Sequence, residues 1–373
     1  MFGTPEFWRD IFYFFLILVA IFFVVNKFIL SKRENATKKQ NILINVLLGV
    51  SLIFIFYRIY KLIPEILNPG EFFTQNIINN LLYVCVLALA TTGIVLIFKT
   101  SNTTNFAQGM IAAIGAFVAA KVVIFLGNTY TEMGNTLMVL LAMLAGSIIA
   151  FGIGICIDVF IIRNSKLPTA VGKQMITMGL VLIITGLIPI VFGTVSMSLP
   201  AMIYGENVDF SLLGMDLYIT QNSLLALGIT FVLLVTLFSM LRFTKWGLGV
   251  RATASNETVA SMMGVNTKVI TAMSWAIAGL LGAVAAVMWA PNTSTVEVTL
   301  MISTQVNGFM AAILGSFGSF AGPLLASVLI PILNGLLTMV ATGWENAIVY
   351  AFILIVVLVK PLGLFGKQVA KKV

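Results

Sequence analysis

Long apolar blocks separated by short polar junctions are the main pattern of the chain. Each block is apolar on all faces rather than alternating with period two. The blocks cover residues 7–30, 42–63, 77–98, 106–126, 136–162, 175–192, 223–241, 270–290 and 347–359. Most reach the roughly 20 helical residues that cross the hydrocarbon core of a bilayer. Because lipid offers backbone groups no other partner, the pattern predicts membrane-spanning helices.

The stretch 303–341 is longer than one span and carries turn residues at its centre. Gly315, Gly318 and Gly322-Pro323 would separate a short descending helix from an ascending one. Broken helices at membrane depth are tolerated where they line a cavity or pack within protein. With this pair included, we expect an all-α, polytopic transmembrane helix bundle of about 10–11 membrane segments.

The charges of the junctions predict how the bundle is oriented. Basic residues fall in the junctions 31–41, 99–105, 163–174 and 242–269 and in the C-terminal tail, whereas the alternate junctions are acidic or neutral. The positive-inside rule then places the basic set in the cytoplasm. The N-terminus is expected outside and the C-terminus inside. With this orientation, the C-terminal tail reaches the cytoplasm only if residues 303–341 enter the membrane from outside and return to the same side.

Composition excludes several classes of protein. Hydrophobic residues make up 60% of the 373 and charged residues only 9%, which is far from a soluble domain. The net charge of +8 belongs to short loops, so membrane orientation explains it and nucleic acid is not an expected partner. The chain has no His and no phosphate-binding loop, so we expect no metal, no cofactor and no ATP site.

Ionisable residues inside the apolar blocks are few. Lys121 and Asp158 lie near block ends, where a long side chain can snorkel to the membrane surface. An ion-coupled carrier usually keeps buried ionisable residues near the midplane. Their scarcity favours an energy source outside this chain.

Two glycine-rich segments suggest an inverted repeat. The segment 109–117 (GMIAAIGAF) resembles 308–317 (GFMAAILGSF), with one residue inserted. The charge count makes the first rise from the cytoplasm and the second descend towards it. Opposite-facing copies are typical of transporters whose substrate path lies between them. The alternative is that Gly and Ala simply recur in a tightly packed bundle.

The cytoplasmic loop at about 242–269 predicts a short helix. Asn256 is a natural N-cap, Glu257 suits the first turn, and Gly264 suits a C-terminal stop, so the helix is expected over 257–263. Its apolar residues at i, i+3 and i+4 are Val259, Met262 and Met263. This face either docks in a groove of a cytoplasmic partner or lies back on the membrane surface.

Three ordered motifs resemble those of the branched-chain amino-acid ABC importer permeases. They are Asn105-Phe-Ala-Gln-Gly109 with Gly115-Ala-Phe117, the loop from Arg251 to Asn266, and Ala311 to Pro323. The resemblance covers about residue 77 to the C-terminus. Residues 71–373 are therefore expected to form the permease domain and residues 1–70 a two-helix extension. Ser316, where a second Gly is common, and Glu257, where no fixed acid is expected, depart from the family pattern.

The resemblance implies a permease subunit of a prokaryotic cytoplasmic membrane, embedded in lipid, that is not itself an enzyme. Its implied partners are cytoplasmic ATP-binding subunits, a second permease subunit and an extracytoplasmic substrate-binding protein. The expected substrate-pathway residues are Asn105, Gln108, Gly109, Gly115, Asn307, Gly308 and Gly315. The expected ATPase-coupling residues are Arg251, Asn256, Glu257, Val259, Ala260, Met262, Met263 and Gly264. The alternative for the pathway set is structural, because Gly packs helices and amides bridge them.

Other functions remain open from the sequence. A permease of the same superfamily could carry urea, a short amide, a sugar or a nucleoside instead. A secondary carrier could also use inverted repeats, although it would need an ion site at the midplane. A membrane enzyme would need clustered His, Asp or Cys near one face, which this sequence lacks.

Overall fold

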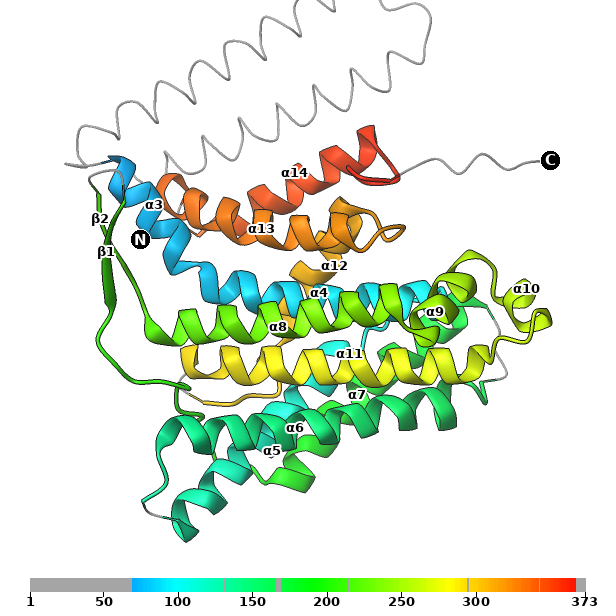
Figure 1. The fold of residues 1–373 in the computed structure, drawn as a ribbon, viewed down its shortest axis with the longest axis horizontal. Helices are drawn as coiled ribbons and strands as arrows, with labels where there is room; N and C mark the ends of the chain where they lie inside the picture. Colours follow the sequence, from blue (N-terminus) through cyan, green and yellow to red (C-terminus); the bar gives the residue numbers. More distant parts are fainter. Residues whose placement is uncertain are drawn as a thin grey trace, which may run out of the picture.

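The computed structural model describes residues 69–130, 132–165, 169–212, 215–293, 295–341 and 343–366. Helices dominate these residues, and Figure 1 shows most of the long ones running along one common direction. The elements are α3 (Pro69–Asn79), α4 (Leu81–Ser101), α5 (Gln108–Thr129), α6 (Asn135–Cys156), η2 (Ile157–Ile162), α7 (Ala170–Phe192), β1 (Val208–Leu212), β2 (Met215–Ile219), α8 (Gln221–Phe243), α9 (Lys245–Ser255), α10 (Glu257–Met262), α11 (Thr267–Trp289), η3 (Ala290–Asn292), α12 (Ile302–Gly315), α13 (Ala321–Val340) and α14 (Glu345–Val359).

Seven of the helices in this described part are long and apolar enough to cross a membrane. They are Leu81–Ser101, Gln108–Thr129, Asn135–Ile162, Ala170–Phe192, Gln221–Phe243, Thr267–Asn292 and Ala321–Thr338. The shorter α14 matches the last predicted block. The all-α, polytopic bundle is therefore confirmed. The segments predicted at 7–30 and 42–63 lie outside the described residues.

Helix α11 occupies the core and packs against α4, α5 and α6. Small residues make this packing possible, because a Cβ on Gly279 would overlap the carbonyl oxygen of Ala150 on α6, and one on Gly154 would overlap that of Trp275 on α11. Helices in lipid associate through such close backbone contacts rather than through hydrophobic exclusion from water. Glycine at these crossings thus holds α6 directly against α11.

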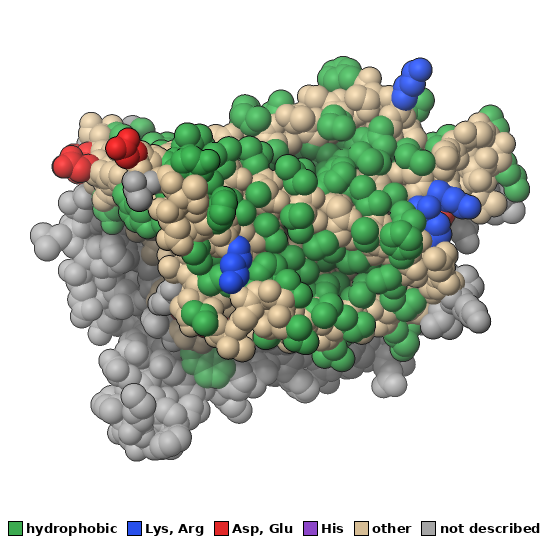
Figure 2. All heavy atoms as spheres, turned by 90° about the horizontal axis from the view of Figure 1, so that it is seen from below, with side chains coloured by type: hydrophobic (Ala, Val, Ile, Leu, Met, Phe, Trp, Pro, Cys, Tyr) green, Lys and Arg blue, Asp and Glu red, His purple; other side chains and the backbone are tan. Residues whose placement is uncertain are grey.

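The two ends of the bundle differ in charge, and the surface between them is apolar. Figure 2 shows hydrophobic side chains across one face, acidic side chains at its left end, basic side chains towards its right end and a further basic side chain between the ends. The left end carries β1 and β2, and the right end carries α9 and α10 (Figure 1). We call these the hairpin end and the α10 end. Many side chains of α7 and α8 between the two ends are exposed, as expected of surfaces that face lipid or a partner subunit.

The stretch predicted to be a broken pair consists of α12 and α13, joined by residues 316–320. The two helices meet closely at this turn, where a Cβ on Gly315 would overlap the backbone of Gly322. Ser316 has a φ of +82°, a conformation that favours glycine. Glycine adopts this conformation at a lower conformational cost than the Ser that occupies the position in this chain.

Helices α5 and α12 run towards opposite ends of the bundle from neighbouring starting points. Gln305 in the first turn of α12 contacts Gly109 in the first turn of α5. The turn after α12 reaches the α10 end, where Lys99 near the end of α4 donates to the carbonyl oxygen of Gly318 at 2.7 Å. Helix α5 leads instead to α6, whose Asn135 bonds the carbonyl oxygen of Ala201 at the hairpin end. The opposed directions match those of the predicted repeat, whose two-fold relation remains a prediction.

Several elements were not expected from the sequence. Strands β1 and β2 form an antiparallel hairpin, with Val208 opposite Ile219. Helix α9 precedes the predicted short helix, and the π-helical turn η2 extends α6. The strands and η2 are too short to give a clear hydrophobic period, and α9 lies in a segment interpreted as a loop.

A pair of glycines on α6 provides a test of the close packing. Gly154→Ala places a methyl group against Trp275 and should lower stability by about 1–3 kcal/mol, as overpacking typically does. Gly152→Ala on the same helix meets open space and should leave stability unchanged or slightly raised. Thermal unfolding of the two purified variants in detergent measures the difference. Equal unfolding temperatures would contradict this packing.

Candidate functional site

Two of the three amides predicted for the substrate pathway, Asn105 and Gln108, lie together at the start of α5. Gln108 donates from Nε2 to the carbonyl oxygen of Ala278, in the middle of α11, at 2.6 Å. Asn105 donates from Nδ2 to Oε1 of Gln108 at 3.2 Å, and its Oδ1 accepts from the backbone N–H of Ala107 at 2.9 Å. Both amide side chains are buried. In this conformation they tie α5 to α11, and their pathway role remains a prediction.

Gln305 completes this cluster, although the sequence interpretation passed over it. Its Nε2 donates to the carbonyl oxygen of Phe106 at 2.6 Å, and its Oε1 accepts from the backbone N–H of Gly109. One side chain on α12 therefore satisfies both a carbonyl and an N–H beside the first turn of α5. Such groups have no partner within the helix itself. The glycine-rich repeat predicted from the sequence includes Gly308, which lies three residues farther along α12, but not Gln305.

Asn307 and Gly308 occupy a different contact. Asn307 donates from Nδ2 to the hydroxyl oxygen of Tyr83 on α4 at 2.6 Å, and its Oδ1 accepts from the hydroxyl of Tyr350 on α14 at 2.7 Å. Gly308 lies beside Thr91 and Ile94 of α4. Asn307 thus joins three helices, and a direct role in transport remains a prediction for both residues.

Gly115 and Gly315 lie at helix contacts. A Cβ on Gly115 would overlap Ala283 of α11, and a Cβ on Gly146 of α6 would overlap the carbonyl oxygen of Gly115. Gly315 packs against Gly322 at the α12–α13 turn. The close backbone contacts expected of these small residues are observed. Their expected role in lining a substrate path remains a prediction.

The predicted coupling segment contains a well-defined short helix, α10. The side chain of Asn256 accepts from the N–H of Val259 at 3.1 Å, as an N-cap does. Gly264 follows the helix with a φ of +84°, and the N–H of Val265 donates to the carbonyl oxygen of Ala260 at 3.0 Å. These are the bonds of a glycine-terminated helix. The predicted range 257–263 is one residue too long, since α10 ends at Met262.

One side of α10 is exposed and apolar. Val259 is 53% exposed, Met262 80% and Met263 79%, while Ala260 is buried against the protein. Helix α10 projects from the end of the bundle in Figure 1. Glu257 is exposed in its first turn, and Arg251 on α9 donates to the carbonyl oxygen of Leu241 at the end of α8 at 2.8 Å. Arg251 therefore anchors the segment instead of offering a free charge.

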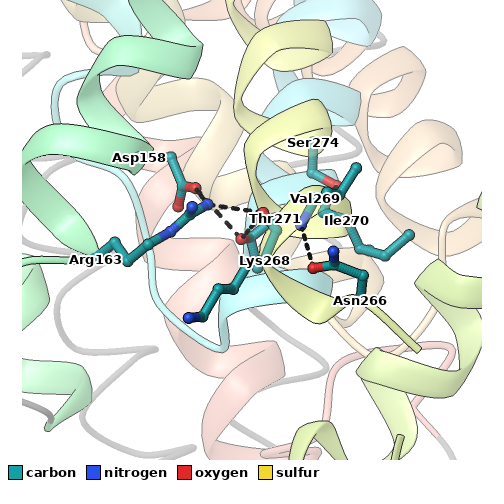
Figure 3. A network of polar contacts seen from close by, with 8 residues as sticks. All are labelled: Asp158, Arg163, Asn266, Lys268, Val269, Ile270, Thr271 and Ser274. Atoms are coloured by element: carbon teal, nitrogen blue, oxygen red, sulfur yellow. Dashed lines mark hydrogen bonds and ion pairs between the residues drawn. The ribbon is translucent and has the colours of Figure 1, made fainter. Parts of the chain in front are cut away.

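Asp158 does not snorkel to the surface, so that expectation is wrong. It is only 3% exposed and accepts from Nη2 of Arg163 at 2.8 Å (Figure 3). The same Nη2 donates to the carbonyl oxygen of Lys268 at 2.8 Å. A buried carboxylate needs such a partner. The two residues are five apart in the sequence, which could have indicated an ion pair. In a regular α-helix, however, residues five apart lie on different faces, so the pair was not predicted.

A cavity of about 450 Å³ opens at the hairpin end, within the size range of small-molecule sites. It lies where α4 and α8 begin and α11 ends. Its lining combines carboxamides with aromatic rings and includes Asn79, Asn80, Tyr83, Asn207, Gln221 and Trp289. Tyr83 and Trp289 are in ring contact at 4.9 Å between centroids. Among the residues that the structure describes, none of those lining it is charged, so this is a neutral, amide-rich cavity.

A bundle of spanning helices with a buried polar cluster and a short exposed helix at one end is the architecture of a multi-pass membrane protein. The family model described as branched-chain amino acid transport system / permease component matches residues 76–358. The chain belongs to this family of membrane transport permeases.

Several curated relatives agree with the family assignment. The chain is 24% identical over 307 residues to the high-affinity branched-chain amino acid transport system permease protein LivH of Escherichia coli K12, covering 81% of this chain and 98% of the relative. It is 26% identical over 264 residues to a probable branched-chain amino acid transport permease protein LivH of Methanocaldococcus jannaschii, covering 69% and 79%. A ribose import permease protein RbsC of Haemophilus influenzae is 22% identical, covering 81% and 90%. No solved structure matches the chain.

The bridge made by Gln305 generates a prediction. Gln305→Leu leaves the carbonyl oxygen of Phe106 and the N–H of Gly109 without partners, which costs about 1–3 kcal/mol for each buried group. Gln305→Glu keeps the acceptor for Gly109 but turns a carboxylate oxygen towards the carbonyl oxygen of Phe106, so it should be destabilised as well. Unfolding temperatures in detergent should be lower for both variants than for the native protein. A Leu variant as stable as the native protein would show that the bridge does not hold α5 to α12.

Proposed function

We propose that this chain is the membrane permease subunit of an ATP-driven importer of branched-chain, hydrophobic amino acids. The observation that carries the proposal is the family match over residues 76–358. Relatives named for the transport of these amino acids, from both E. coli and M. jannaschii, support the substrate class. The neutral, amide-rich character of the cavity and of the buried cluster agrees with a substrate that carries no net charge.

The energy enters through a partner in this proposal. Cytoplasmic ATP-binding subunits bind the exposed face of α10, formed by Val259, Met262 and Met263. An amphipathic helix laid in an apolar groove is a common mode of protein recognition. When ATP closes the paired subunits, they displace α10 and shift the bundle between inward-open and outward-open states. The ATP is hydrolysed in those partners.

The assembly includes a second permease subunit, identical or homologous, and an extracytoplasmic substrate-binding protein. The α10 end then faces the cytoplasm and the hairpin end faces outward, with the C-terminus inside and the N-terminus outside. The separation of basic residues at one end from acidic ones at the other supports this orientation. Acidic residues of the hairpin region, such as Asp209 and Asp216, would then face the binding protein.

The substrate path in this proposal runs from the hairpin-end cavity to the cluster at the start of α5. Asn105 and Gln108 there are bonded within the protein, and Gln305 links them to α12 through Phe106 and Gly109. Movement of α5 relative to α12 exchanges these internal bonds for bonds to the substrate. Amides make this exchange without trapping a zwitterion, because they carry no net charge.

A sugar is the second candidate substrate, because a ribose import permease is among the relatives. Carboxamides and aromatic rings, as in the hairpin-end cavity, suit the hydroxyls and faces of a sugar as well. A urea, short-amide or nucleoside permease has no such relative in its favour. An ion-coupled carrier would need a midplane ion site, and the buried polar cluster holds only amides.

Substrate competition distinguishes these candidates. Cells that lack their own uptake systems, and that produce the permease with its partner subunits, should take up labelled leucine. Excess isoleucine or valine should compete with that uptake, because the proposed site accepts a zwitterion with a branched apolar side chain. Excess ribose or urea should not compete. Uptake of labelled ribose, together with no uptake of leucine, would favour a sugar as the substrate and contradict the amino-acid proposal.

The docking role of α10 has its own test. Val259→Asp or Met262→Asp puts a charge into the proposed apolar contact and should lower uptake at least tenfold. A loss of about 1.4 kcal/mol of binding free energy is enough to weaken the docking by that factor. Both side chains are exposed, so membrane insertion and stability should be unchanged. Ser261→Asp adds the same charge at an exposed position of α10 outside this apolar face, so it is the matched control and should transport normally. Normal ATP-driven uptake by both Val259→Asp and Met262→Asp would refute the docking claim.

A further inference from the structure

An ion pair lies inside the α10 end of the bundle, and the transport path makes no use of it. The side chain of Asp158 is 5% exposed and that of Arg163 is 30% exposed, with 2.8 Å between Oδ2 and Nη2. Removing one partner of such a pair leaves an uncompensated buried charge. A hydrophobic contact could hold two helices together without this risk. The pair therefore calls for an explanation beyond stability.

The local backbone is shaped to form this pair. In an α-helix of 3.6 residues per turn, residues five apart point about 140° away from each other. In the π-helical turn η2, the N–H of Arg163 donates to the carbonyl oxygen of Asp158 at 2.9 Å, which brings the two residues onto one face. Isolated π-turns are rare and often occur at functional sites.

The pair also reaches a second helix. Nη2 of Arg163 donates to the carbonyl oxygen of Lys268 in the first turn of α11 at 2.8 Å. The hydroxyl of Thr271 lies between the same two groups, 3.1 Å from that carbonyl oxygen and 3.4 Å from Oδ2 of Asp158. Figure 3 shows these side chains converging from η2 and α11. We call this set of contacts the α6–α11 joint.

A short segment connects helix α10 to the α6–α11 joint. Only residues 263–266 separate α10 from α11. Val265 is held by its bond to Ala260, and Asn266 caps α11 by accepting from the N–H of Val269 at 3.3 Å. A displacement of α10 therefore reaches the first turn of α11 directly.

Beyond the joint, the motion has a path to the buried amide cluster. Helix α6 is packed on α11 at Gly154 and Gly279, and on α5 at the contact between Gly146 and Gly115. Close-packed helices of this kind move together rather than deforming continuously. Helix α5 carries Gln108 into the cluster at the start of the proposed path.

We propose that Asp158 and Arg163 are positioning residues for energy coupling, which make α6 and α11 respond as one body when α10 is displaced. The proposal rests on the proposed function, in which α10 receives the motion of the ATP-binding subunits. The joint itself touches neither substrate nor partner. Its contribution is to carry the displacement from α11 into α6 and so into α5.

The test uses the complete importer reconstituted in lipid vesicles, with uptake and ATP hydrolysis measured on the same sample. The double variant Asp158→Asn with Arg163→Gln removes both charges together, so no lone charge stays buried. It should assemble and hydrolyse ATP, but its uptake per ATP should fall about tenfold or more, within the usual range of coupling energies. Arg242→Gln, an exposed charge at the same end, is the control and should leave the ratio unchanged.

A ratio equal to that of the native importer in the double variant would overturn the proposal. If the double variant does not assemble, Arg163→Lys decides instead, since it keeps the charge but lacks the guanidinium that holds two acceptors. Its ratio should also fall, and a native ratio would overturn the proposal. Failure of the proposed function gives a different result. In that case Val259→Asp would transport normally, whatever the effect of the variants of Asp158 and Arg163.

Discussion

The structure depends on close backbone contact between helices that share a lipid environment. Lipid gives apolar helices no reason to leave it, so association requires surfaces that fit. Gly154, Gly279 and Gly115 provide such surfaces by letting α5, α6 and α11 approach until backbone meets backbone or a small side chain. The result is a close-packed central body that carries Gln108 on α5 and lies against the Asp158–Arg163 pair.

This central body links two regions that lie far apart. At one end, α10 presents an apolar face that the protein itself does not cover. Deeper in the bundle, Gln108 and Gln305 hold the start of α5 against α11 and α12 through hydrogen bonds. Hydrogen bonds can be exchanged, whereas interlocked glycine crossings cannot be shifted gradually. We therefore expect the packed helices to move as rigid units and the hydrogen bonds of the amide cluster to change during transport.

The sequence was sufficient for the spanning helices between residues 77 and 359, the break at Gly315–Pro323 and the cap at Asn256, because each has a local signal. It was insufficient for Gln305 and for the partners of Gln108 and Asn307, since those contacts join residues that only the tertiary fold brings together. Asp158 was misjudged because a π-turn changes which residues share a face. The β1–β2 hairpin was missed because its strands are short and largely exposed.

The central claim is that this permease moves its substrate with energy delivered by partner subunits and not by an ion gradient. Uptake of labelled leucine into vesicles containing the reconstituted importer tests it most directly, with ATP supplied on the α10 side and the binding protein on the hairpin side. The account predicts uptake that requires ATP and is unaffected when proton and sodium gradients are collapsed. Uptake that continues without ATP and stops with the gradient would contradict it.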